Sequence, residues 1–184
     1  MLFRSYDEGF AIDRSQGYSC DPTLYLPGAD RALRDIDAVT PVLLGLPFVD
    51  RSRFIVGGQS RGGVLTIAWA GRQPTLPRAA VNFVGGWMGA GCSTASTINQ
   101  TLFKRGGAFT QPTIWLYGEG DSFYPLSHSR ENFAAFQAAG GKGTFNAYTP
   151  ANSMNGHFIN SVPALWGNTM EAYLAERGLP SKAN

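Results

Sequence analysis

Residues 53–69 have the sequence RFIVGGQSRGGVLTIAW, which passes from a short apolar run through glycines to a helical pattern. The run Arg53–Gly57 is bounded by glycine, as buried strands commonly are. Gly63–Trp69 then predicts a helix. Between them, residues 58–62 fit the pattern G-x-S-x-G, and a strand–turn–helix context is what a nucleophile elbow requires. This segment predicts an α/β fold with Ser60 at the carboxyl end of a strand.

Strands and helices are expected to alternate along the rest of the chain. Short apolar runs predict strands at residues 79–84, 112–117 and 145–148. Helices are predicted at residues 30–44, 96–104, 127–139 and 163–177, with Pro41 kinking or ending the first. The polar, turn-rich stretch 4–28 is expected to form a loop. The alternation predicts a single domain over residues 1–184, with a mostly parallel sheet and helices on both faces.

Composition and charge exclude several classes of protein. The 184 residues include 43% hydrophobic and 15% charged residues, which is enough apolar surface for a buried core. The net charge of +2 is not concentrated in a Lys/Arg cluster, so nucleic-acid binding is not expected. No apolar run reaches the ~20 residues of a membrane helix. The start lacks the features of a secretory signal, so a cytoplasmic location is the default expectation.

The two cysteines, Cys20 and Cys92, are too few for a disulfide scaffold. We expect buried free thiols at both positions. The alternative is a single bridge, which would indicate an oxidising compartment.

A nucleophilic serine needs a base that is oriented by a third group. Of the two histidines in the chain, His157 follows the last predicted strand on a loop that can reach over the carboxyl edge of the sheet. We therefore favour it over His128, which is expected to be a solvated residue at a helix start. Asp121 leaves the third strand through two glycines and is favoured as the acid over Glu119.

The surroundings of Ser60 suggest further roles. A sharp turn strains the serine backbone and requires small neighbours at Gly58 and Gly62. The backbone N–H of Arg61, at the amino terminus of the following helix, is the first candidate for an oxyanion donor. An apolar acyl pocket is expected to be lined by Tyr117, Phe123 and Tyr124. Two separated histidines without clustered carboxylates give no metal-ligand set, and no cofactor is expected.

Four stretches of the sequence together resemble the dienelactone hydrolase-like branch of the α/β-hydrolase superfamily. They are Gly58–Gly63, Val81–Trp87, Leu116–Asp121 and Gly156–His157. The resemblance covers most of the chain and implies a Ser–His–Asp esterase or related acyl hydrolase. The founding dienelactone hydrolases have cysteine where this chain has Ser60.

Members of that superfamily usually have a further N-terminal segment before the stretch that corresponds to Arg4–Gly17. The resemblance thus implies an N-terminally truncated fold in which Met1–Arg4 is the end of the family's fourth strand. The strand before Ser60 would then lack a neighbour, and the exposed edge would favour homo-oligomers. The oxyanion hole would lack one donor, unless Tyr6 or a nearby residue supplied it.

We expect a small-molecule ester as the substrate. The alternatives are a serine peptidase of the prolyl-oligopeptidase kind, and a catalytically impaired hydrolase fold that serves as a binding module. The sequence selects neither the natural ester nor the acyl chain.

Overall fold

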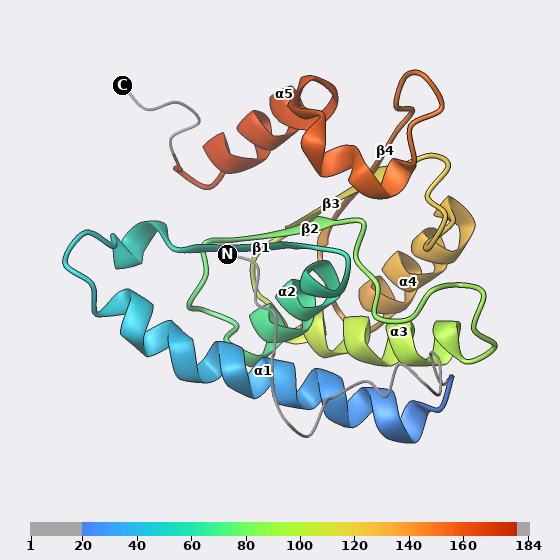
Figure 1. The fold of residues 1–184 in the computed structure, drawn as a ribbon. Helices are drawn as coiled ribbons and strands as arrows, with labels where there is room; N and C mark the ends of the chain where they lie inside the picture. Colours follow the sequence, from blue (N-terminus) through green and yellow to red (C-terminus); the bar gives the residue numbers. More distant parts are fainter. Residues whose placement is uncertain (1–19, 180–184) are drawn as a thin grey trace.

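The computed structural model describes residues 20–179 (Figure 1). Its sheet has the order β1-β2-β3-β4, and all neighbouring strands are parallel. The strands are β1 (Ile55–Gln59), β2 (Ala79–Phe83), β3 (Thr113–Gly118) and β4 (Gly143–Tyr148). The helices are α1 (Pro22–Leu44), α2 (Arg61–Arg72), α3 (Ala95–Lys104), α4 (Leu126–Ala138) and α5 (Pro163–Ala175), with short 3-10 turns η2 (Arg51–Arg53), η3 (Arg105–Ala108) and η4 (Gly156–Ser161).

The predicted strands and helices are all present, with ends that differ by a few residues, apart from the first helix. This helix begins at Pro22, so the prediction of a loop as far as Gly28 was wrong. Asp21 caps it by accepting a hydrogen bond of 2.8 Å from the backbone N–H of Thr23. Pro22 is the first helical residue, where a backbone N–H would have no acceptor within the helix. The helix also continues past Pro41 to Leu44. Met1–Arg4, Tyr6 and Arg4–Gly17 lie outside the described residues.

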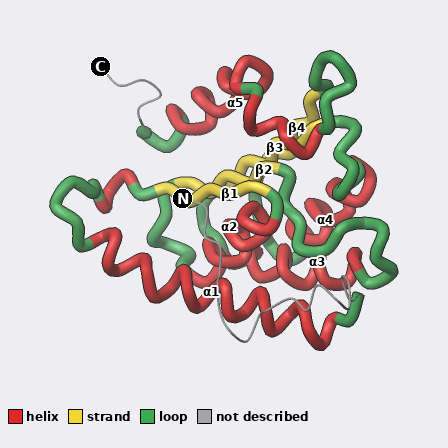
Figure 2. The backbone as a smooth tube through the Cα atoms, viewed as in Figure 1, coloured by secondary structure: helices red, strands yellow, loops and turns green. Residues whose placement is uncertain are grey.

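Helices cover both faces of the sheet, as predicted. Figure 1 shows α5 on one side and α1, α2, α3 and α4 on the other, and Figure 2 shows the four strands between these two layers. The larger apolar core includes the fully buried Trp69, Trp115 and Phe136 on the four-helix side. A smaller core joins Tyr173 of α5 to Ile114 and Leu116 of β3. A mostly parallel sheet between helices confirms the predicted fold class.

The strand before Ser60 lies at one edge of the described sheet. Strand β1 pairs with β2 alone among residues 20–179, and its Ile55 is 45% exposed. An apolar side chain on an edge strand favours pairing with another chain. Self-association through β1 stays a prediction.

The cysteines form a disulfide, so the prediction of free thiols was wrong. The bridge joins Cys20 to Cys92 across 72 positions of sequence, with the two Cα atoms 5.6 Å apart. It connects the start of α1 to the segment before α3, and these two helices pack together. Packing between distant helices brings the sulfurs together, which sequence spacing alone did not indicate.

None of the helices described in residues 20–179 combines the length and the apolar composition that a membrane span requires.

Candidate active site

The three predicted catalytic residues follow three strands of the sheet. Ser60 follows β1, Asp121 lies in the loop after β3, and His157 lies in the loop after β4. Because the strands are parallel, all three loops leave the same edge. Carboxyl edges of parallel sheets are where open α/β folds bind ligands.

Ser60 has a strained backbone, with φ 56° and ψ −122°. A non-glycine residue at positive φ costs free energy and persists only where its surroundings hold it. The Ser60 N–H donates to the Phe83 carbonyl at 3.0 Å, and the Ser60 carbonyl accepts from the N–H groups of Gly63 and Gly86 at 2.9 and 3.1 Å. These bonds hold the turn between β1 and α2 against the end of β2.

The two glycines that flank this turn differ in how closely they are packed. A Cβ on Gly58 would lie 2.3 Å from the backbone carbon and oxygen of Gly62, so only glycine fits there. A Cβ on Gly62 would meet no atom within 4 Å. The expectation that both positions need small residues therefore holds at Gly58 and is wrong at Gly62, because a side chain at 62 would point away from the turn.

The side chains of His157 and Asp121 are in direct contact at this edge. The imidazole Nδ1 lies 3.0 Å from Asp121 Oδ2, and the Asp121 side chain is fully buried. The other carboxylate oxygen accepts the backbone N–H groups of Phe123 and Tyr124 at 2.7 and 2.9 Å. An ionised carboxylate only accepts hydrogen bonds, so Nδ1 is the donor in this contact, and in the neutral imidazole Nε2 then has the free lone pair.

The loop of His157 is joined to the strand that leads to Ser60. The side-chain amide of Gln59 donates to the His157 carbonyl at 2.9 Å. Among the described residues, however, no hydrogen bond links Ser60 Oγ to the imidazole of His157. The structure thus pairs the histidine with the acid and places both loops at the edge that carries Ser60.

Two positioning residues were missed by the sequence analysis. Asn155 Oδ1 accepts the backbone N–H groups of His157 and Ser122 at 3.0 and 3.3 Å, and its Nδ2 donates to Ser122 Oγ at 2.7 Å. It therefore ties the histidine loop to the acid loop. Asparagine directly before a helical turn is a known capping signal, so Asn155 could have been found. The contact of Gln59 spans 98 positions and left no such signal.

The competing histidine and carboxylate lie elsewhere. His128 is buried instead of solvated, because α4 packs against α3 at this position. Its Nε2 lies 2.9 Å from the side-chain nitrogen of Asn99 in α3. Burial lowers the pKa of His128, and Glu131 opposes this shift. Glu119 is exposed and accepts a hydrogen bond of 2.8 Å from Thr149 Oγ1. Neither residue reaches the His157–Asp121 pair by a hydrogen bond.

The three predicted pocket residues have different surroundings. Tyr117 is fully buried in the core, and its hydroxyl donates to the Gly85 carbonyl at 2.9 Å, so it offers no surface to a ligand. Tyr124 is also buried, with its ring centroid 5.5 Å from that of His157. Phe123 is half-exposed and lies closer to the imidazole, at 4.7 Å. Of these three side chains, Phe123 alone is exposed enough to contact a ligand.

Arg61 is the first residue of α2, so its backbone N–H belongs to the amino-terminal turn of that helix. Such N–H groups point outward along the helix axis and attract negative charge. The Arg61 side chain is directed to the segment after β2, where its guanidinium lies over the Trp87 ring at 5.1 Å.

In residues 20–179, no group of three or more His, Cys, Asp or Glu side chains could hold a metal ion.

Comparison with known proteins shows a shared fold. No protein-family model matches the sequence. No curated protein matches it either. Solved structures do match: a Klebsiella pneumoniae protein assigned as a dienelactone hydrolase is similar over 80% of this chain, with a TM-score of 0.57 and 22% identity. A single-residue variant of Arabidopsis thaliana SOBER1 matches over 81%, with a TM-score of 0.55 and 16% identity. An acylaminoacyl peptidase from Pyrococcus horikoshii matches over 79%, with a TM-score of 0.51 and 19% identity.

These neighbours are longer than the present chain. It spans 64% of the SOBER1 variant, 61% of the Klebsiella chain and 26% of the Pyrococcus chain. The similarity at this level of identity concerns the backbone arrangement. The expected resemblance is confirmed for the fold.

Proposed function

Because the chain has the α/β-hydrolase fold, we propose that it is a serine hydrolase of carboxylic esters that acts through Ser60, His157 and Asp121. The observation that carries the proposal is the 3.0 Å contact between His157 Nδ1 and the buried Asp121 carboxylate, at the sheet edge where Ser60 is held at positive φ. A structural ion pair alone would not account for a strained serine at the same edge.

The proposed reaction begins when Ser60 Oγ attacks the ester carbonyl carbon and His157 Nε2 takes the hydroxyl proton. The backbone N–H of Arg61 donates a hydrogen bond to the oxyanion that develops. The tetrahedral intermediate then collapses, the C–O bond to the alcohol breaks, and the alcohol leaves with the proton from His157. Water, deprotonated by the same imidazole, hydrolyses the acyl-enzyme.

Asp121 has a supporting role in this mechanism. Its Oδ2 accepts from Nδ1–H, which keeps the proton off Nε2 and stabilises the imidazolium that forms after proton transfer. Bonds to the N–H groups of Phe123 and Tyr124 hold this carboxylate in place. The Ser60–His157 hydrogen bond forms when substrate binds, since catalytic hydrogen bonds are often long in ligand-free structures and tighten in the complex.

An ester is favoured over a peptide as the substrate. An alkoxide is a better leaving group than an amine anion, so ester cleavage demands less of His157 as the general acid. The Klebsiella neighbour is assigned as a dienelactone hydrolase, and a lactone is a cyclic ester. The Pyrococcus neighbour is an acylaminoacyl peptidase, which makes amide cleavage the second candidate. Parallel assays of p-nitrophenyl esters and aminoacyl p-nitroanilides distinguish the two.

The decisive experiment is labelling by a fluorescent fluorophosphonate, which reacts with activated serines. We expect the purified protein to be labelled, Ser60→Ala to abolish the label, and Asp121→Asn to lower kcat by about 10⁴. Ser52→Ala is the matched control, because this exposed serine lies in η2 before β1 and should keep the label. A folded protein that neither takes the label nor hydrolyses p-nitrophenyl esters contradicts the proposal and favours the binding module.

A further inference from the structure

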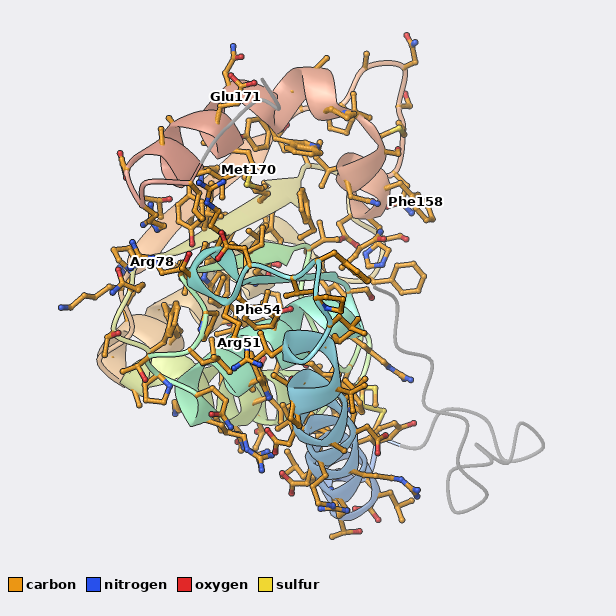
Figure 3. All side chains as sticks on the ribbon, turned by 90° about the vertical axis from the view of Figure 1, so that its left-hand side faces the viewer. Arg51, Phe54, Arg78, Phe158, Met170 and Glu171 are labelled. Atoms are coloured by element: carbon orange, nitrogen blue, oxygen red, sulfur yellow. A yellow bond between two sulfur atoms is a disulfide. The ribbon has the colours of Figure 1, made fainter. Side chains whose placement is uncertain are left out.

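Two half-exposed phenylalanines contact the imidazole of His157. Phe123 and Phe158 are each 51% exposed, and their ring centroids lie 4.7 and 5.7 Å from that of His157. They come from separate loops, one after β3 and the other in η4 after β4. Figure 3 places Phe158 at the margin of the molecule, away from the core. The candidate base thus lies between its buried acid and exposed apolar surface.

Exposed apolar side chains that are scattered singly are normal on protein surfaces. Phe123 and Phe158 are not scattered, since both contact the same ring. The other large hydrophobic side chains exposed in the described part of the chain lie outside these two loops: Leu24, Val42, Phe48 and Ile55. An apolar patch beside a polar reaction centre is typical of a ligand-binding surface.

Hydrogen bonds fix the main chain of both phenylalanines. The Phe123 N–H donates to Asp121 Oδ1 at 2.7 Å, and the Phe123 carbonyl accepts from Ala90 at 2.9 Å. The Phe158 N–H donates to the Asn155 carbonyl at 3.0 Å, and the Phe158 carbonyl accepts from Ser161 Oγ at 2.7 Å. The bond to Asp121 Oδ1 joins the backbone of Phe123 to the carboxylate that contacts His157. Both rings are therefore carried by main chain that is fixed beside His157.

The residues immediately around these rings include no Asp, Glu, Lys or Arg. Residues 122–124 are Ser-Phe-Tyr, and residues 155–159 are Asn-Gly-His-Phe-Ile. Asp121, directly before the first stretch, has its carboxylate paired with His157 Nδ1. The residues around Phe123 and Phe158 therefore favour a substrate whose group at this position is neutral and apolar.

We propose that Phe123 and Phe158 form an apolar rim that binds the hydrocarbon or aryl group of a hydrophobic ester. This inference rests on the proposed function and names its substrate class: esters with an apolar chain, in preference to short or charged ones. Contact with both rings removes the chain from water, and burial of each methylene changes affinity about fourfold.

The test compares p-nitrophenyl acetate with p-nitrophenyl octanoate in Phe123→Ala, Phe158→Ala and the matched control Phe48→Ala. Phe48 is 80% exposed and lies in the connection between α1 and η2. Figure 1 shows this connection on the left, away from the loop that follows β4. We expect the octanoate-to-acetate ratio of kcat/KM to fall about tenfold in each rim variant, to recover in Phe123→Leu, and to stay constant in Phe48→Ala. Equal losses on both esters would show that the rings only position His157, and would overturn the proposal, as would an unchanged ratio.

A second measurement separates this proposal from the function on which it rests. Calorimetry of the binding of p-nitrophenyl octanoate and p-nitrophenyl acetate to Ser60→Ala requires no turnover. The rim is supported if the octanoate ester binds at least tenfold more tightly than the acetate ester and if Phe123→Ala, added to Ser60→Ala, removes this difference. This result would support the rim even if the fluorophosphonate does not label Ser60 in the wild-type protein. If the protein hydrolyses esters but shows no such preference, the function stands and the rim is excluded.

Discussion

Gly118 at the end of β3 and Gly156 before His157 approach each other so closely that neither position has room for a side chain. A Cβ on Gly118 would lie 2.5 Å from the Gly156 carbonyl oxygen, and a Cβ on Gly156 would lie 2.4 Å from the Gly118 carbonyl oxygen. Neither glycine has a positive φ, so close approach is what requires the missing side chain. This contact sets the distance between the loops of Asp121 and His157.

We expect Gly156→Ala to displace the His157 loop from β3. Overpacking of this kind costs about 1–3 kcal/mol of stability. If the proposed mechanism is right, the shift of the imidazole should also lower kcat/KM by about 100-fold, since a displacement of about 1 Å has that effect on catalysis. Urea unfolding and ester hydrolysis measure the two effects.

Gly167→Ala is the control for this variant. A Cβ on Gly167, inside α5, would meet no atom within 4 Å, so the change should raise stability by up to about 1 kcal/mol. Wild-type activity in Gly156→Ala would contradict the importance of the Gly118–Gly156 contact.

The elbow itself offers a matched pair of glycines. Gly58→Ala drives a methyl group into the backbone of Gly62 and should lower the free energy of unfolding by about 3 kcal/mol. Gly62→Ala places its methyl group in open space and should leave that free energy within about 1 kcal/mol of wild type. Urea unfolding measures both free energies. Similar losses of stability in Gly58→Ala and Gly62→Ala would contradict the difference in packing between the two glycines.

The disulfide should contribute substantially to stability. Closing a loop of 72 positions removes conformational entropy from the unfolded chain, so the change of Cys20 and Cys92 to serine should cost about 4 kcal/mol. Unfolding with and without reductant measures the effect, and the double variant should not respond to reductant. Two titratable thiols in the unreduced protein would contradict the bridge.

His128 should make stability depend on pH. Burial lowers its pKa from the ordinary value of 6.5, and the Asn99 side-chain nitrogen beside Nε2 favours the neutral ring. The unfolded state therefore binds the proton more readily. Stability is full above pH 6.5 and decreases as the pH falls from there towards the lowered pKa of the folded state.

His128→Gln removes this titration. Thermal unfolding between pH 4.5 and 7.5 should show a weaker dependence in the variant than in wild type in the range below about pH 6.5. Parallel curves for the two proteins would show that His128 is not the group responsible.

Local sequence signals were sufficient for the alternating strands and helices and for the order Ser60, Asp121, His157. Apolar runs bounded by glycine mark strands because such runs gain most from burial, and the parallel arrangement follows from the helices between them. Since parallel strands end at one edge, the sequence also indicated that the three residues would share that edge.

Contacts between distant segments required the tertiary structure. The Cys20–Cys92 bridge depends on the packing of α1 against α3, and the burial of His128 depends on Asn99 of a neighbouring helix. Phe123 meets His157, which lies 34 positions later in the chain, because the loops after β3 and β4 leave the same edge of the sheet. Periodicity and capping act over a few residues, so the sequence alone determined the elements and their order. Side-chain packing acts through space, and it alone decided which thiols, rings and glycines meet.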